Sequence, residues 1–146
     1  YKGRGDVLDR PLPALRSAIV IVKVPDHVST VEAYAALDAD TERDTSGNSR
    51  AIRDALRFGE VADVGALLRN DFTPVIAARI SQIGSILEEL RATPGVLGAE
   101  MSGSGSAVFA LTETDEVAEG VAQTYHRQGL FTHAGRLALA GVTILI

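Results

Sequence analysis

The segment "AIVIVKV" (residues 18–24) is rich in β-branched side chains and almost continuously apolar. A run of this composition is typical of a strand in the middle of a sheet, buried on both of its faces. Pro25 ends the run, since proline cannot continue the hydrogen-bond ladder of a central strand. We therefore expect a sheet built around residues 18–24.

A short helix is predicted directly after this strand. In "STVE", Ser29 and Glu32 form a capping box, which predicts a helix over about residues 30–37. We expect this helix to bury Val31, Tyr34 and Leu37.

A longer helix is predicted after residue 72. Thr73 is a suitable N-cap and Pro74 suits the first helical position. Apolar side chains then recur at spacings of three and four, at Ile76, Ile80, Ile83, Leu87 and Leu90. The pattern predicts one helix that ends at "TPG" (residues 93–95).

The second half of the chain alternates short strands with one helix. Strands are predicted near residues 96–101 and 107–111. A helix should begin at Thr114, bury Val121 and Tyr125, and end at Gly129. "LFTHAGRLALAGVTILI" (residues 130–146) predicts a strand, a turn near Gly135, and a further extended segment.

The resulting element order is strand, helices, strand, strand, helix, strand. This order is the split βαβ arrangement, a ferredoxin-like α+β fold. We expect a four-stranded, mostly antiparallel sheet with helices on one face and residues 18–24 at its centre. The length of 146 residues suits a single domain over residues 1–146.

Composition excludes several classes of function. The formal net charge is −5 with no basic stripe, which argues against nucleic-acid binding. No apolar run approaches the roughly 18 residues of a membrane span, so no membrane partner is expected. The chain has no cysteine, which excludes disulfides and thiolate chemistry and is typical of a cytoplasmic protein.

The most distinctive segment is "MSGSGSAVFAL" (residues 101–111), where five serine and glycine residues precede a strand-like run. Glycines can turn several backbone N–H groups to one side and form a nest that binds anions such as phosphate. The same residues also suit an ordinary hairpin loop in which glycine supplies positive φ. Both interpretations place the loop at the surface, so we expect valine at Gly103 or Gly105 to leave the fold intact.

"MSGSGSAVFAL" also resembles the third glycine-rich motif of the GHMP kinases, the family of galactokinase, homoserine kinase and mevalonate kinase. Three further stretches resemble the branch that phosphorylates 4-diphosphocytidyl-2-C-methyl-D-erythritol: "GRGDVLDRPLP" (residues 3–13), "VPDHVSTVEAYAALD" (residues 24–38) and "RNDFTPV" (residues 69–75). The helix that leads into the glycine loop also follows in the expected place. The resemblance spans Gly3 to about Tyr125.

The resemblance implies that this chain is the C-terminal domain of such a kinase. In the family, the catalytic aspartate, a lysine-bearing strand and the main ATP loop lie upstream of "GRGD", and none is present here. The resemblance therefore implies no catalytic and no metal-binding residue in this chain, and no turnover by the chain alone. The full enzyme would use ATP and Mg²⁺, and this chain would hold no tightly bound cofactor.

The resemblance also implies which residues contribute to the site. Gly103 and Gly105, with Ser102, Ser104 and Ser106, would face phosphate oxygens. Thr30 would lie near the acceptor alcohol, although a hydroxyl at a helix start also serves as a local cap. Asn70 and Asp71 are explained by turn formation before the helix.

Two alternatives remain open from the sequence. One is another GHMP kinase that acts on homoserine or mevalonate, whose third motif would look similar. The other is a split-βαβ module that binds a ligand or dimerises without catalysis. The coding sequence upstream of Tyr1 would distinguish the kinases from the module.

Overall fold

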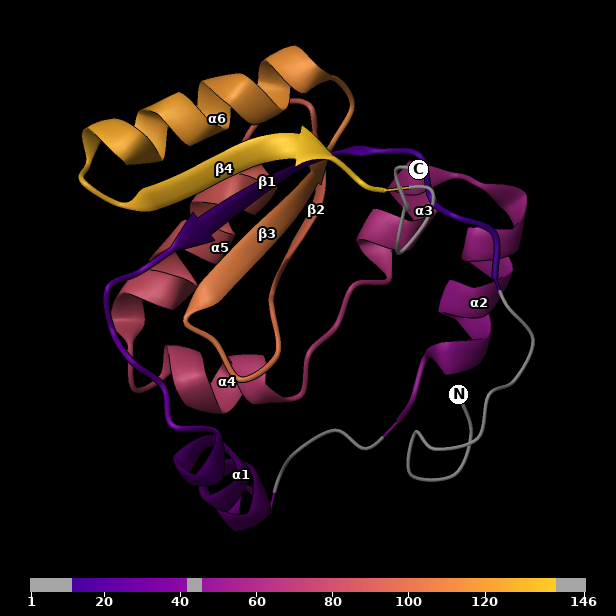
Figure 1. Cartoon of the computed structure of the whole chain (residues 1–146). Coiled ribbons are helices and arrows are strands. Elements are labelled where there is room, and N and C mark those ends of the chain that lie inside the picture. Colours follow the sequence, from indigo (N-terminus) through magenta and orange to yellow (C-terminus); the bar gives the residue numbers. More distant parts are fainter. Residues whose placement is uncertain (1–11, 42–45, 139–146) are drawn as a thin grey trace, which may run out of the picture.

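The structure, a computed structural model, describes residues 12–41 and 46–138. Its centre is one antiparallel sheet with the strand order β2-β3-β1-β4 (Figure 1). The strands are β1 (Ala18–Lys23), β2 (Val96–Met101), β3 (Ala107–Thr112) and β4 (Phe131–Arg136). The predicted four-stranded sheet with residues 18–24 at its centre is thereby confirmed.

Helices occupy the long connection after β1 and the connection between β3 and β4. They are α1 (Thr30–Ala39), α2 (Ser49–Phe58), α3 (Val61–Ala66), α4 (Phe72–Ala77), α5 (Ser81–Ala92) and α6 (Asp115–Arg127). The element order confirms the predicted α+β split βαβ arrangement.

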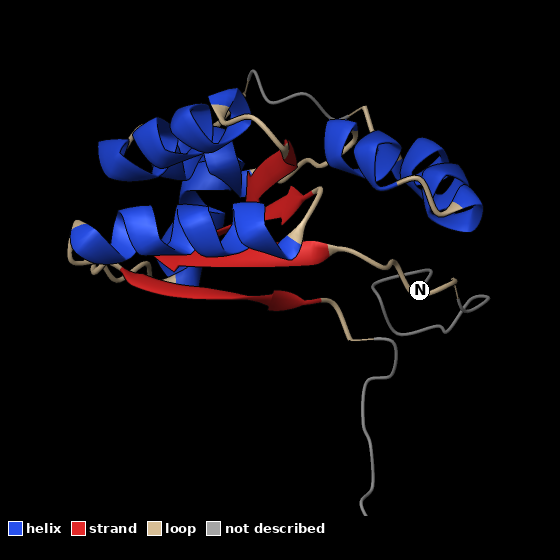
Figure 2. Cartoon of the chain, turned by 90° about the horizontal axis from the view of Figure 1, so that it is seen from above, coloured by secondary structure: helices blue, strands red, loops and turns tan. Residues whose placement is uncertain are grey.

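The two faces of β1 are covered unequally. Val20 and Val22 are fully buried in the main core, to which α5 and α6 contribute their apolar faces. Ile19 points to the opposite face, because side chains alternate along a strand, and is partly buried with Ala55 of α2 and Val64 of α3. The main helical layer lies on one face as predicted, and α2 with α3 adds a smaller cover on the other. Figure 2 shows the helices in these separate groups beside the strands.

The predicted start of α1 is confirmed, and Leu37 is buried as predicted. The prediction is wrong for Val31, which is 79% exposed, and for Tyr34, which is 55% exposed. Ala33 and Ala36 are buried in their place. The helix packs on α4, away from the sheet, so most of its side chains stay exposed (Figure 1). Ser29 forms no side-chain cap bond either.

The single helix predicted from Thr73 onward is also wrong, because the chain breaks it in two. Ile80, with φ −119° and ψ 83°, separates α4 from α5. Ile76 and Ile83 still enter the same core, so the apolar spacing marks the buried side chains correctly. No proline or glycine lies between residues 77 and 81, so nothing local in the sequence signals the break.

The last described strand runs further than predicted. β4 continues through Gly135, which pairs with Ile19 of β1, so the predicted turn near Gly135 is wrong. The further extended segment predicted at the C-terminus falls partly on residues 139–146, outside the described residues. The predicted helix before β4 is confirmed, with the Thr114 hydroxyl accepting from the Val117 N–H.

A buried tyrosine links α5 and α6. The Tyr125 hydroxyl donates to Glu89 at 2.8 Å, and burial, together with this bond, raises the pKa of Tyr125 above that of an ordinary tyrosine. Above about pH 10 the unfolded chain loses this proton while the folded chain retains it, so the free energy of unfolding falls.

Tyr125→Phe should therefore lose about 1 kcal/mol of stability at about pH 8, the value of one hydrogen bond. The difference from the unsubstituted chain should narrow toward about pH 11, because phenylalanine does not titrate. Urea unfolding across this range measures both effects. A difference that stays constant with pH would contradict the raised pKa.

None of the helices in the described residues has the length and apolar character needed to cross a membrane.

Candidate functional site

The serine-glycine loop (residues 102–106) joins β2 to β3 and adopts a conformation that requires glycine. Gly103 has φ +56° and Gly105 has φ +86°. The Gly105 N–H donates to the Ser102 carbonyl at 3.0 Å, and the Ser102 N–H donates to the Ala107 carbonyl at 2.8 Å. The backbone is thus fixed as a tight turn at the end of two paired strands.

Some N–H groups of this loop remain open. Within the part of the chain that the structure describes, the N–H groups of Gly103 and Ser104 donate to no acceptor. Neighbouring open N–H groups beside a glycine of positive φ are the arrangement that binds anions in backbone nests. The geometry therefore agrees with the phosphate-binding interpretation, and the role itself stays a prediction.

The C-terminal half of the loop is anchored in the core. Ser106 is buried, and its hydroxyl donates to the Val24 carbonyl at 3.0 Å. A Cβ on Gly105 would lie 2.9 Å from the Met101 sulfur and 3.6 Å from Ile76. Valine at Gly105 would therefore disturb the core, contrary to the expectation from sequence. At Gly103 a Cβ would meet nothing within 4 Å.

Thr30 and Ser104 are brought together although 74 residues separate them. The Thr30 and Ser104 hydroxyl oxygens lie 3.4 Å apart, which places the start of α1 against the loop. The structure thus gathers Thr30 with the predicted loop residues at one place. Contact of Thr30 with an acceptor alcohol stays a prediction.

Asn70 is a site residue that sequence reasoning assigned only to a turn. Its side-chain oxygen accepts from the Phe72 N–H at 2.9 Å, which confirms the turn. Its amide nitrogen also donates to the Met101 carbonyl at 2.8 Å and to the Gly103 carbonyl at 2.7 Å. These long-range bonds have no local signal in the sequence beyond the "RNDFTPV" element itself.

A hollow of about 770 Å³ lies beside the loop. Ser102, Gly103 and Asn70 form part of its wall, and Tyr34 and Phe72 form another part. The two rings meet edge to face, with centroids 4.9 Å apart. The hollow therefore combines open backbone donors with an aromatic surface, as a site for a phosphorylated small molecule requires.

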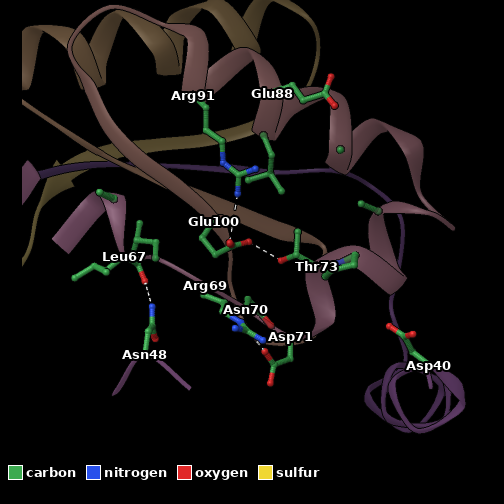
Figure 3. A pocket seen from close by; sticks show the side chains of 16 residues that line it. Asp40, Asn48, Leu67, Arg69, Asn70, Asp71, Thr73, Glu88, Arg91 and Glu100 are labelled. Carbon is green, nitrogen blue, oxygen red and sulfur yellow. Dashed lines mark hydrogen bonds and ion pairs between the residues drawn. The ribbon is translucent and has the colours of Figure 1, made fainter. Parts of the chain in front are cut away.

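A neighbouring hollow of about 620 Å³ shares Asn70 and contains a buried carboxylate (Figure 3). Glu100 accepts from the Thr73 hydroxyl, from the Met101 N–H at 2.8 Å and from Arg91 at 3.3 Å. Glu100 thus connects α4, α5 and the end of β2 directly before the loop.

The family model described as "GHMP kinases C terminal" matches residues 49–129, more than half of the chain. The chain belongs to the GHMP kinase family. The family-level resemblance seen in the motifs is therefore confirmed.

Two curated relatives of this GHMP kinase domain carry the same name. The chain is 36% identical over 126 residues to the 4-diphosphocytidyl-2-C-methyl-D-erythritol kinase of Pelotomaculum thermopropionicum, covering 86% of this chain and 43% of the relative. It is 39% identical over 124 residues to the kinase of the same name from Gloeobacter violaceus, covering 82% of this chain and 40% of the relative. The chain thus spans less than half the length of these curated relatives.

Two solved kinase structures resemble the fold of this chain. A crystal structure of 4-(cytidine 5'-diphospho)-2C-methyl-D-erythritol kinase matches with a TM-score of 0.70 and 27% identity, over 88% of this chain and 45% of that chain. A homoserine kinase from Cytophaga hutchinsonii matches with a TM-score of 0.67 and 22% identity, over 92% of this chain and 45% of that chain. The second match shows the fold alone.

The described residues of this GHMP kinase domain, 12–41 and 46–138, assemble no group of three or more histidine, aspartate or glutamate side chains that could hold a metal ion.

Proposed function

We propose that this chain is the C-terminal half of a kinase that transfers the γ-phosphate of ATP to the 2-hydroxyl of 4-diphosphocytidyl-2-C-methyl-D-erythritol. The observation that carries the proposal is the serine-glycine loop, which has open N–H groups at Gly103 and Ser104 and whose residues Ser102 and Gly103 line the 770 Å³ hollow. The names of the relatives support this substrate.

In the proposed reaction the 2-hydroxyl oxygen attacks the γ-phosphorus, and the bond between that phosphorus and the bridging oxygen of ADP breaks. The hydroxyl proton passes to a base supplied by the half of the enzyme outside this chain. Phosphoryl transfer depends mainly on positioning and on stabilising charge on the phosphate oxygens. The loop N–H groups would act as fixed donors to that charge, and Thr30 would position the acceptor alcohol.

ATP would arrive as its magnesium complex, and the magnesium ion is therefore part of the substrate. The described residues of this chain offer no cluster of ligands for it. The chain's own contribution would be one wall of the cleft, without a tightly bound cofactor. We also propose the cytoplasm as its location, where ATP and soluble sugar-alcohol substrates are available.

The test is turnover by the two-half protein in which this chain is joined to its upstream half. We expect ATP-dependent phosphorylation of 4-diphosphocytidyl-2-C-methyl-D-erythritol, with a kcat/KM at least roughly 1,000-fold above those for homoserine and mevalonate, because a site built for one set of hydroxyls rejects analogues that leave its polar groups unpaired. The 146-residue chain alone should give no turnover above background.

If the protein prefers homoserine or mevalonate, the proposed substrate is wrong, but the proposed kinase activity stands. No turnover with any of the three, or turnover by the chain alone, would contradict the proposed function.

A further inference from the structure

The amide of Asn70 holds the serine-glycine loop at two points. Its nitrogen donates to the carbonyls of Met101 and Gly103, at 2.8 and 2.7 Å. We propose that Asn70 is a positioning residue, which orients the open N–H groups of the loop toward the transferred phosphate. The inference rests on the proposed function and adds to it a residue that acts through the loop.

The planarity of the peptide bond explains how a bond to a carbonyl can orient an N–H group. The Gly103 carbonyl and the Ser104 N–H belong to one trans peptide unit, so they point in opposite directions. When Asn70 fixes the direction of the Gly103 carbonyl, the Ser104 N–H is fixed to point away from Asn70. A donor without a partner of its own is thereby given a defined direction.

Such a hold is needed because glycine has no Cβ and leaves the backbone torsions of residue 103 weakly constrained. Without it, the peptide unit after Gly103 could rotate and reverse the Ser104 N–H. Two hydrogen bonds from one rigid amide favour the held orientation by roughly a factor of ten or more. The glycine-rich sequence of the loop permits several conformations, and a side chain 33 positions away in the sequence favours one of them.

Asn70 is itself held in place. Its oxygen accepts from the Phe72 N–H at the start of α4. The next residue of α4, Thr73, donates to Glu100, and Glu100 also accepts from the Met101 N–H. Met101, the residue before the loop, is thus bonded directly to the buried Glu100 carboxylate. Asn70 is linked to the same carboxylate through the start of α4, so Asn70 and Met101 move little relative to one another.

The substitution Asn70→Asp separates the turn from the positioning role. Aspartate keeps an oxygen for the Phe72 N–H but cannot donate to the Met101 and Gly103 carbonyls when it is ionised. In the two-half protein we expect kcat to fall roughly 10- to 100-fold, the range for misplacing a reacting geometry by up to about 1 Å. KM for both substrates should stay within about threefold, since the loop acts on the phosphate as it transfers.

Gln123→Glu is the matched control. It makes the same change from an amide to a carboxylate at an exposed position of α6, and Gln123 lines neither of the two hollows beside the loop. We expect its kcat to stay within about threefold of the unsubstituted protein. An equal loss of kcat in both variants would reduce Asn70 to a structural role and overturn the proposal.

Amide hydrogen exchange provides a readout that does not depend on activity. The bonded N–H groups of Ser102 and Gly105 should exchange at least about tenfold faster in Asn70→Asp, because the loop opens only when its bonds to Asn70 are lost. In Gln123→Glu their exchange rates should not change. If the exchange rates of the loop N–H groups do not change in Asn70→Asp, Asn70 does not orient the loop and the proposal is overturned. If these rates rise while kcat stays unchanged, the orientation of the loop does not matter for phosphoryl transfer, which also overturns the proposal. If the unsubstituted protein has no turnover, the proposed function fails, and the exchange rates alone decide whether Asn70 orients the loop.

Discussion

Replacing Gly103 by valine in the two-half protein is expected to lower kcat by roughly 100-fold while the fold remains intact. Gly103 has φ +56°, a region that β-branched residues avoid, so its N–H and that of Ser104 would turn away from their present directions. The loss of one positioned donor to developing charge costs about 3 kcal/mol, which corresponds to roughly 100-fold in rate. No neighbour lies within 4 Å of the added Cβ, so the core is not disturbed.

Gly129→Val is the control for backbone strain. Gly129 also has a positive φ, +85°, and also has nothing within 4 Å of an added Cβ, but it lies in the turn between α6 and β4. Both variants should lose about 1–2 kcal/mol of stability, the cost of a left-handed conformation for an L-residue. Steady-state kinetics and thermal unfolding measure the two effects. A kcat for Gly103→Val within about threefold of that for Gly129→Val would mean that the loop is an ordinary hairpin.

The largest loss of stability is expected from Gly98→Ala. Gly98 of β2 and Gly65 of α3 are in direct backbone contact, and a Cβ on Gly98 would lie 2.3 Å from the Gly65 carbonyl oxygen. Backbone atoms cannot move aside as the end of a side chain can, so α3 would have to separate from the sheet. Overpacking of this kind costs about 3 kcal/mol or more.

Gly120→Ala, in the interior of α6, is the matched control for the same chemical change. An added Cβ there meets nothing within 4 Å, and alanine favours the helix by about 0.5–1 kcal/mol. Urea unfolding of the two variants and the unsubstituted chain measures both effects. The free energy of unfolding should fall in Gly98→Ala and rise in Gly120→Ala. A Gly98→Ala protein as stable as the unsubstituted chain would show that α3 does not rest on β2.

The sheet was predictable because its strands carry their own signals. Residues 18–24 are apolar enough to require a central position, and the alternation in β3 places Val108 and Ala110 in the core. The side chains of α1 were not predictable in the same way. Its apolar Val31 and Tyr34 stay more than half exposed because α1 packs on α4 and not on the sheet, which depends on the tertiary arrangement alone.

In the candidate site, too, local features could be predicted from the sequence and tertiary contacts could not. The serine-glycine loop was recognisable from composition, since two glycines in five residues indicate positive φ and close backbone approach. Asn70 was assigned to a turn from its local context, and that turn exists. Its bonds to the carbonyls of Met101 and Gly103 join residues 31 and 33 positions apart, a tertiary contact that no local pattern encodes.

We infer that the serine-glycine loop directs backbone donors at the transferring phosphate. The most direct measurement is a crystal structure of the two-half protein with 4-diphosphocytidyl-2-C-methyl-D-erythritol and a non-hydrolysable ATP analogue. We expect the N–H group of Gly103 or Ser104 at about 3 Å from an oxygen of the γ-phosphate, the hydrogen-bond distance for such donors. A γ-phosphate bound more than about 6 Å from both N–H groups, beyond even one bridging water, would contradict it.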